Sequence, residues 1–168
     1  ARTHLPAAVR EIRVRVADAA AAQGDAMLTT IGLGSCEAIV LYDADRRVGG
    51  LAHVLLPSES LAQDRSNRAK FPGTAVPMLL EQMQQLGARP TRITARIVGG
   101  ASMFAALMPA GGLQMGERNL LATRDALGKA RLPITGEDVG GGHGRSVFFH
   151  LASGTVQVRS MVKGDVVL

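Results

Sequence analysis

The sequence has one cysteine, no tryptophan and only five aromatic residues among 168. A single cysteine excludes an intrachain disulfide and suits a reducing compartment, so we expect a cytoplasmic protein. With so few aromatic side chains, a folded core must be built mainly from aliphatic residues. No apolar run approaches the roughly 18 residues of a membrane span, which predicts that the chain does not insert into a bilayer.

Clustered positive charge is also missing, although the chain carries a net charge of +5. The arginines are scattered, no run of lysine or arginine exceeds two, and no aromatic platform is available for base stacking. We therefore predict no nucleic-acid binding. The charge is either a solvated basic surface or a means of binding an acidic helical partner. His143 and His150 lack metal-ligand spacing to Cys36 or His53, so we predict neither a metal nor another cofactor.

The hydrophobic patterns predict an α+β fold, because strands precede, interrupt and follow two main helices without regular alternation. Residues 1–10 are expected to be a flexible lead-in, and residues 11–168 one domain. Residues 17–24 suggest an alanine-rich helical turn or loop. Helices are expected at residues 74–86, with Thr74 as N-cap, at 115–127 and, shorter, at 101–108. Strands are expected at residues 11–17, 25–30, 37–42, 48–56, 91–98, 133–139, 146–151 and 155–159. The tail 165–168 receives no assignment.

The chemically distinctive stretch is a predicted β-hairpin that begins at Cys36 and returns through His53. In an antiparallel pair, the residue numbers of directly opposed residues always add to the same total. A two-residue turn at Ala44 and Asp45 fixes that total, and the resulting register sets Cys36 opposite His53. Their Cβ atoms would then lie about 4.5–5.5 Å apart. A slip of one residue would move His53 to the other face, and Gly49-Gly50 offers a place for a bulge.

A thiol facing an imidazole is a nucleophile and base pair, in which an imidazolium lowers the thiol pKa. Thr30 is expected to orient the imidazole by accepting its second N–H. Gly32, Gly34 and Ser35 form a turn whose backbone N–H groups are suited to an oxyanion site. Spacing alone leaves the alternative open, in which Cys36 is an inert buried thiol and His53 a core residue.

Two further segments have both a structural and a functional interpretation. Gly99 and Gly100 follow a strand directly, so with Ala101 they either complete a pocket or turn the chain. The polar loop 60–70 either borders a substrate site or is a solvated connection.

Several ordered motifs resemble the chemoreceptor glutamine deamidase family, CheD, between residues 11 and 159. They are the segments 30–36, 41–43, 49–57, 98–104, 116–119, 138–141 and 144–145. The resemblance implies a layered α/β sandwich, with mixed, largely antiparallel strands covered by two main helices. It also implies a protein-glutamine glutaminase that converts glutamine to glutamate in the methylation helices of methyl-accepting chemotaxis receptors. By this resemblance Cys36 is the nucleophile, His53 its base and Thr30 the orienting residue.

The resemblance leaves a second function open, which is binding and regulation of a CheC-type phosphatase. A cysteine peptidase or a transglutaminase is a weaker enzymatic alternative for the same pair. Glu37 departs from the family pattern, which has a small or β-branched apolar residue after the cysteine. Strand alternation places Glu37 on the face opposite Cys36, so we expect it to have little effect on the thiol.

Overall fold

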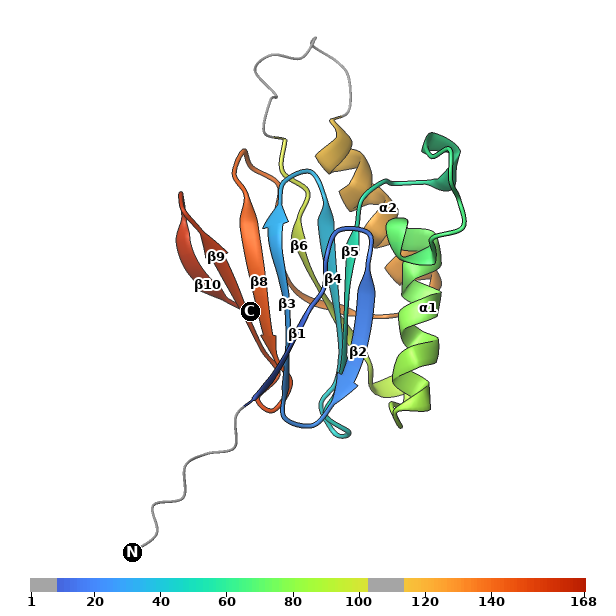
Figure 1. Cartoon of the computed structure of the whole chain (residues 1–168), viewed down its shortest axis with the longest axis vertical. Coiled ribbons are helices and arrows are strands. Elements are labelled where there is room, and N and C mark those ends of the chain that lie inside the picture. The colour runs from blue at the N-terminus through green and yellow to red at the C-terminus, as the bar shows by residue number, and fades with distance from the viewer. Residues whose placement is uncertain (1–8, 103–113) are drawn as a thin grey trace, which may run out of the picture.

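The computed structural model describes residues 9–102 and 114–168, which form two five-stranded sheets and two α-helices in three layers (Figure 1). The helices cover one face of the first sheet, and the second sheet covers its other face. The expected α+β sandwich with two main helices is thus confirmed. Neither described helix is long and apolar enough to cross a membrane.

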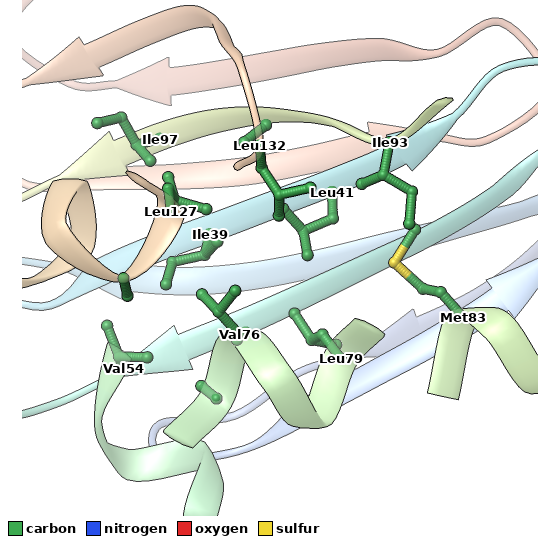
Figure 2. Packing of buried hydrophobic residues seen from close by; sticks show 14 of the residues in the cluster. Ile39, Leu41, Val54, Val76, Leu79, Met83, Ile93, Ile97, Leu127 and Leu132 are labelled. Carbon is green, nitrogen blue, oxygen red and sulfur yellow. The ribbon is translucent and has the colours of Figure 1, made fainter. Parts of the chain in front are cut away.

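The helix-covered sheet lies in the middle layer. Its strands, in spatial order, are β2 (Ala19–Gln23), β5 (Val48–Val54), β4 (Glu37–Asp43), β6 (Thr94–Gly99) and β7 (Ile134–Val139). Helices α1 (Pro72–Gln85) and α2 (Met115–Lys129) pack on it through an aliphatic cluster that includes Ile39, Leu79 and Leu127 (Figure 2). This packing supplies the aliphatic core that the shortage of aromatic residues predicts.

The outer sheet packs against the opposite face of β4 and β5. Its strands, in spatial order, are β1 (Arg10–Arg13), β3 (Ala26–Leu33), β8 (Arg145–His150), β9 (Thr155–Ser160) and β10 (Gly164–Val167). Leu28, Val40 and Phe149 lie in the core between the two sheets. Because β4 and β5 are covered on both faces, every residue of each is buried, and their sequences are almost continuously apolar.

Gly49 and Gly50 permit this close layering. A Cβ atom at Gly49 would lie 2.6 Å from the Phe149 ring, and one at Gly50 would lie 3.1 Å from Leu79 and Met83. The pairing of β4 with β5 runs without a register shift through both glycines, so they form no bulge.

Several local predictions were wrong at their edges. Residues 19–23 form strand β2, because small alanine side chains let α1 approach the sheet and tertiary packing overrides their helix propensity. Arg10, assigned to the lead-in, already pairs with Ala26.

Helix α1 begins at Pro72, and the Thr74 hydroxyl donates to the Arg68 carbonyl instead of capping the helix. Most of the expected helix 101–108 lies outside the described residues. The tail beyond residue 163 forms β10, which pairs with β9.

The predicted register of the central hairpin was also wrong, by two residues. His53 pairs with Ala38 instead of Cys36, and Glu37 pairs with Val54. The connection has four residues, 44–47, because the Asp43 carboxylate accepts the N–H groups of both Asp45 and Arg46. A shift of two residues preserves strand parity, so Cys36 and His53 keep the same face of the sheet.

Candidate active site

Five ends of secondary-structure elements meet at one end of the molecule (Figure 1). They are the ends of β3, β5 and β6 and the beginnings of β4 and α2. Cys36 immediately precedes β4, His53 is the penultimate residue of β5, and Thr30 lies in β3. Thr30 therefore approaches His53 from the facing sheet, and the three residues come from both layers of the sheet sandwich.

The hydrogen bonds of Thr30 determine the tautomer of His53. The Thr30 hydroxyl lies 2.7 Å from the Val14 carbonyl, to which it donates its only proton. The same oxygen lies 2.7 Å from His53 Nδ1, so it must accept the Nδ1–H. The imidazole therefore carries its proton on Nδ1 and a lone pair on Nε2. This is the orienting contact expected from the sequence, and Val14 is a contributor that sequence patterns did not reveal.

His53 lies on the face of β5 that packs against the outer sheet. Nε2 is buried and has no hydrogen-bond partner among the described residues. Cys36 is half-buried and packs against the same inter-sheet core. Since Ala38 is the direct partner of His53, Cys36 is its diagonal neighbour on the same face. No hydrogen bond joins the Cys36 thiol to Nε2.

Both members of the pair are neutral at pH 7. Burial raises the pKa of the Cys36 thiol above its ordinary value, and Glu37 raises it further. Burial lowers the pKa of His53 from 6.5 to about 4. The expectation that an imidazolium lowers the pKa of Cys36 is therefore wrong for this structure, because desolvation disfavours charge on both groups. The site holds a thiol beside a neutral base.

Glu37 lies behind the nucleophile, on the helix side of β4. It is completely buried, and neither carboxyl oxygen has a hydrogen-bond partner among the described residues. Burial raises the pKa of Glu37 from 4.5 to about 8, although Arg145 and Arg124 oppose the shift. Its predicted face is thus correct, but the expected lack of influence on Cys36 is not, since Glu37 raises the pKa of the thiol.

The turn before Cys36 is held by the segment that follows β6. Gly100 N–H donates to the Cys36 carbonyl at 2.8 Å, and Ala101 N–H donates to the Gly34 carbonyl at 2.9 Å. Gly99 and Gly100 have φ of 114° and 66°, and a Cβ at Gly99 would approach the Cys36 carbonyl oxygen to 2.4 Å. The glycine pair thus lets the backbone after β6 approach the turn closely, and its completion of a pocket stays a prediction.

Gly32 and Ser35 occupy different positions in this turn. Gly32 has a φ of 78° at the exposed end of β3, whereas the Ser35 carbonyl accepts a hydrogen bond from the Asn119 side chain of α2. Sequence reasoning included Asn119 in a family motif but gave it no role. Its complete burial, which is uncommon for asparagine, becomes visible only in the folded chain.

Two surface features adjoin the site. A cavity of about 530 Å³ is lined by Gly32, Ile31, His143, Phe148 and Met161 among others, but neither Cys36 nor His53 lines it. The polar loop 60–70 returns to the end of β5, where the Lys70 backbone carbonyl accepts a hydrogen bond from Leu55 N–H at 2.9 Å. The loop therefore borders the strand end that carries His53.

Comparisons with known proteins give one family. A family model described as CheD chemotactic sensory transduction matches residues 55–160. Three curated relatives each bear the name "Probable chemoreceptor glutamine deamidase CheD". The protein of Caldanaerobacter subterraneus subsp. tengcongensis is 41% identical over 153 residues, 91% of this chain and 94% of the relative. The Moorella thermoacetica protein is 42% identical, covering 90% and 92%. The Pyrococcus abyssi protein is 39% identical, covering 94% and 96%.

Proposed function

This chain belongs to the CheD family, and from that premise we propose that it hydrolyses glutamine side-chain amides of chemoreceptors, with Cys36 as nucleophile. The product is glutamate, with ammonia released, so the enzyme is a protein-glutamine glutaminase. One observation carries the assignment of catalytic residues. The 2.7 Å contact between Thr30 Oγ1 and His53 Nδ1 leaves the lone pair of Nε2 on the face that it shares with the only cysteine.

The first half of the reaction forms a thioester. His53 Nε2 takes the thiol proton as the Cys36 sulfur attacks the amide carbon, and the carbonyl oxygen becomes an oxyanion. Backbone N–H groups of the turn 34–36 stabilise that charge. The imidazolium then protonates the nitrogen, the C–N bond breaks and ammonia leaves. Because the starting pair is neutral, proton transfer accompanies the attack instead of preceding it.

The second half regenerates the enzyme. His53 removes a proton from water, the resulting hydroxide attacks the thioester carbon, and the C–S bond breaks with return of the proton to sulfur. Thr30 keeps accepting Nδ1–H throughout and so holds the ring in register. A hydroxyl is a neutral orienting group and stabilises the imidazolium less than a carboxylate would.

The test uses the purified chain and the cytoplasmic fragment of a chemoreceptor. We expect ammonia release and the mass gain of amide-to-acid conversion at specific glutamines, and we expect Cys36→Ala and His53→Ala to abolish both. His150→Ala is the control, because His150 lies in β8 away from the site residues. Full activity in a folded Cys36→Ala variant refutes the proposal. Backbone cleavage or amine incorporation would indicate a peptidase or a transglutaminase instead.

Binding of a CheC-type phosphatase is the second candidate and stays a prediction from family resemblance. Pull-down of such a phosphatase by a chain that releases no ammonia from receptor would favour it. Cys36 is a free cysteine, and a reducing compartment keeps a thiol in that form, so we place the reaction in the cytoplasm.

A further inference from the structure

Three consecutive carbonyl groups in the turn before β4 are each fixed by a donor from outside the turn. The Gly34 and Cys36 carbonyls accept from the backbone of Ala101 and Gly100. The Ser35 carbonyl, between them, accepts a 2.8 Å hydrogen bond from Asn119 Nδ2. Asn119 is thus the only side chain among the three donors.

The orientation of the Ser35 carbonyl determines that of the next N–H. In a trans peptide, the C=O of one residue and the N–H of the following residue point in opposite directions. No described peptide bond is cis. Because the Ser35 carbonyl points toward α2, the Cys36 N–H points away from the helix layer, toward the inter-sheet face on which the Cys36 side chain packs.

The electrostatics of the thiol agree with this direction. The pKa of the Cys36 thiol is raised by burial and by Glu37, and its own backbone N–H opposes that shift. Among the described residues this N–H donates to no backbone carbonyl outside regular strand pairing. A backbone N–H on the face of the nucleophile is the kind of donor that an oxyanion site requires.

The same amide nitrogen also reaches the strand that carries the base. Asn119 Nδ2 lies 3.2 Å from the carbonyl of Leu55, two residues after His53, so its two hydrogens serve the nucleophile and base segments together. The helix that holds Asn119 is closely packed at this point. A Cβ at Gly116, one turn earlier, would lie 2.3 Å from the Ala101 carbonyl oxygen. Asn119 is itself completely buried.

We propose that Asn119 is a positioning residue, which holds the Ser35–Cys36 peptide in the orientation that supplies the Cys36 N–H to the oxyanion. This inference rests on the proposed deamidation. Asn119 touches neither substrate nor sulfur in this scheme, and it acts through the peptide that it anchors. Without the amide donor, the peptide plane is free to rotate and its N–H leaves the site.

The test compares two reactions of the same sulfur. Deamidation passes through an oxyanion, whereas alkylation by iodoacetamide displaces iodide at a carbon and forms none. We expect Asn119→Ala and the bulkier Asn119→Leu to lower kcat for deamidation by about 100-fold, the effect of removing one oxyanion donor. KM and the alkylation rate of Cys36 at a fixed alkaline pH should change by less than about threefold.

Thr123→Val is the matched control, because Thr123 is equally buried one turn later on α2 and its hydroxyl has no partner among the described residues. Its kcat should stay within about twofold of wild type. Unchanged kcat in a folded Asn119 variant overturns the inference, and so does an equal loss of deamidation and alkylation, which indicates general disruption. If the wild-type chain itself releases no ammonia, the proposed function fails first. Circular dichroism identifies whichever Asn119 variant retains the fold.

Discussion

Replacing the buried carboxyl behind the nucleophile with its neutral isostere should stabilise the fold increasingly as the pH rises. Glu37 is completely buried, its pKa is 4.5 when unfolded and about 8 when folded, and neither oxygen has a partner among the described residues. Glu37→Gln keeps the shape of the protonated acid but cannot ionise.

The sign and size follow from proton linkage. Between pH 4.5 and 8 the folded state binds more protons than the unfolded state, so the wild type loses stability as the pH rises through this window. The Glu37 contribution is intact below pH 4.5. At 1.36 kcal/mol per pKa unit, the free energy of unfolding of Glu37→Gln should exceed that of wild type by about 1 kcal/mol at pH 5, about 3 at pH 7 and about 5 at pH 9.

Urea denaturation followed by circular dichroism measures this difference, since the chain has no tryptophan for fluorescence. Taking the difference between variants at each pH cancels the titration of other groups. Glu59→Gln is the control on an exposed carboxylate, and it should change stability by less than about 0.5 kcal/mol at every pH. A Glu37→Gln advantage that does not grow with pH would refute the buried, neutral carboxyl. The same variant should also move alkylation of Cys36 to lower pH, because Glu37 raises the pKa of the thiol.

Three other outcomes are expected. Thr30→Val should lower kcat for deamidation by at least about tenfold, because it removes the hydroxyl that contacts His53. Thr29 is the buried neighbour of Thr30 in β3, and Thr29→Val should not lower kcat in this way. Equal losses in the two variants would contradict the orienting role of Thr30. Since the pKa of His53 falls from 6.5 unfolded to about 4 folded, its contribution to stability is intact above pH 6.5 and is lost on acidification through pH 4. Relative to His53→Gln, the free energy of unfolding of the wild type, measured by urea denaturation, should fall by about 3 kcal/mol across that window. An equal fall in both proteins on acidification would contradict a buried neutral imidazole. Gly99→Ala should lower the free energy of unfolding by about 2 kcal/mol or more in thermal unfolding, because its Cβ meets the Cys36 carbonyl and the backbone has a φ of 114°. A Cβ at Gly73 in α1 has open space, so Gly73→Ala should be neutral or stabilising. Equal effects of the two substitutions would contradict the close packing at Gly99.

Sequence patterns predicted the helices and strands with strong hydrophobic periodicity. They failed for segments whose conformation is determined by tertiary contacts. The hairpin of β8 and β9 and both main helices were expected within a few residues of their observed bounds. The alanine run that forms β2 was not, because its conformation depends on α1 packing above it. An edge strand such as β10 likewise has no pattern of its own and exists through pairing with β9.

The candidate site was predicted in composition better than in geometry. Parity along the strands was sufficient to place Cys36 and His53 on one face, but the Asp43 side chain lengthened the turn and changed the direct partner. The charge state was missed, because desolvation depends on layers that only the folded chain brings together. Asn119 was missed as well, since its partners lie 84 and 64 residues away in sequence.

The central claim is that Cys36 itself becomes acylated by the receptor glutamine, and intact-mass measurement tests it most directly. A reaction of the chain with a glutamine-containing receptor peptide, quenched in acid during the first turnover, should yield an adduct at Cys36. The mass added to the chain should equal the mass of the peptide less that of ammonia. Glutamate formed by a folded Cys36→Ala variant, with no adduct on the wild type at any time point, would contradict the account.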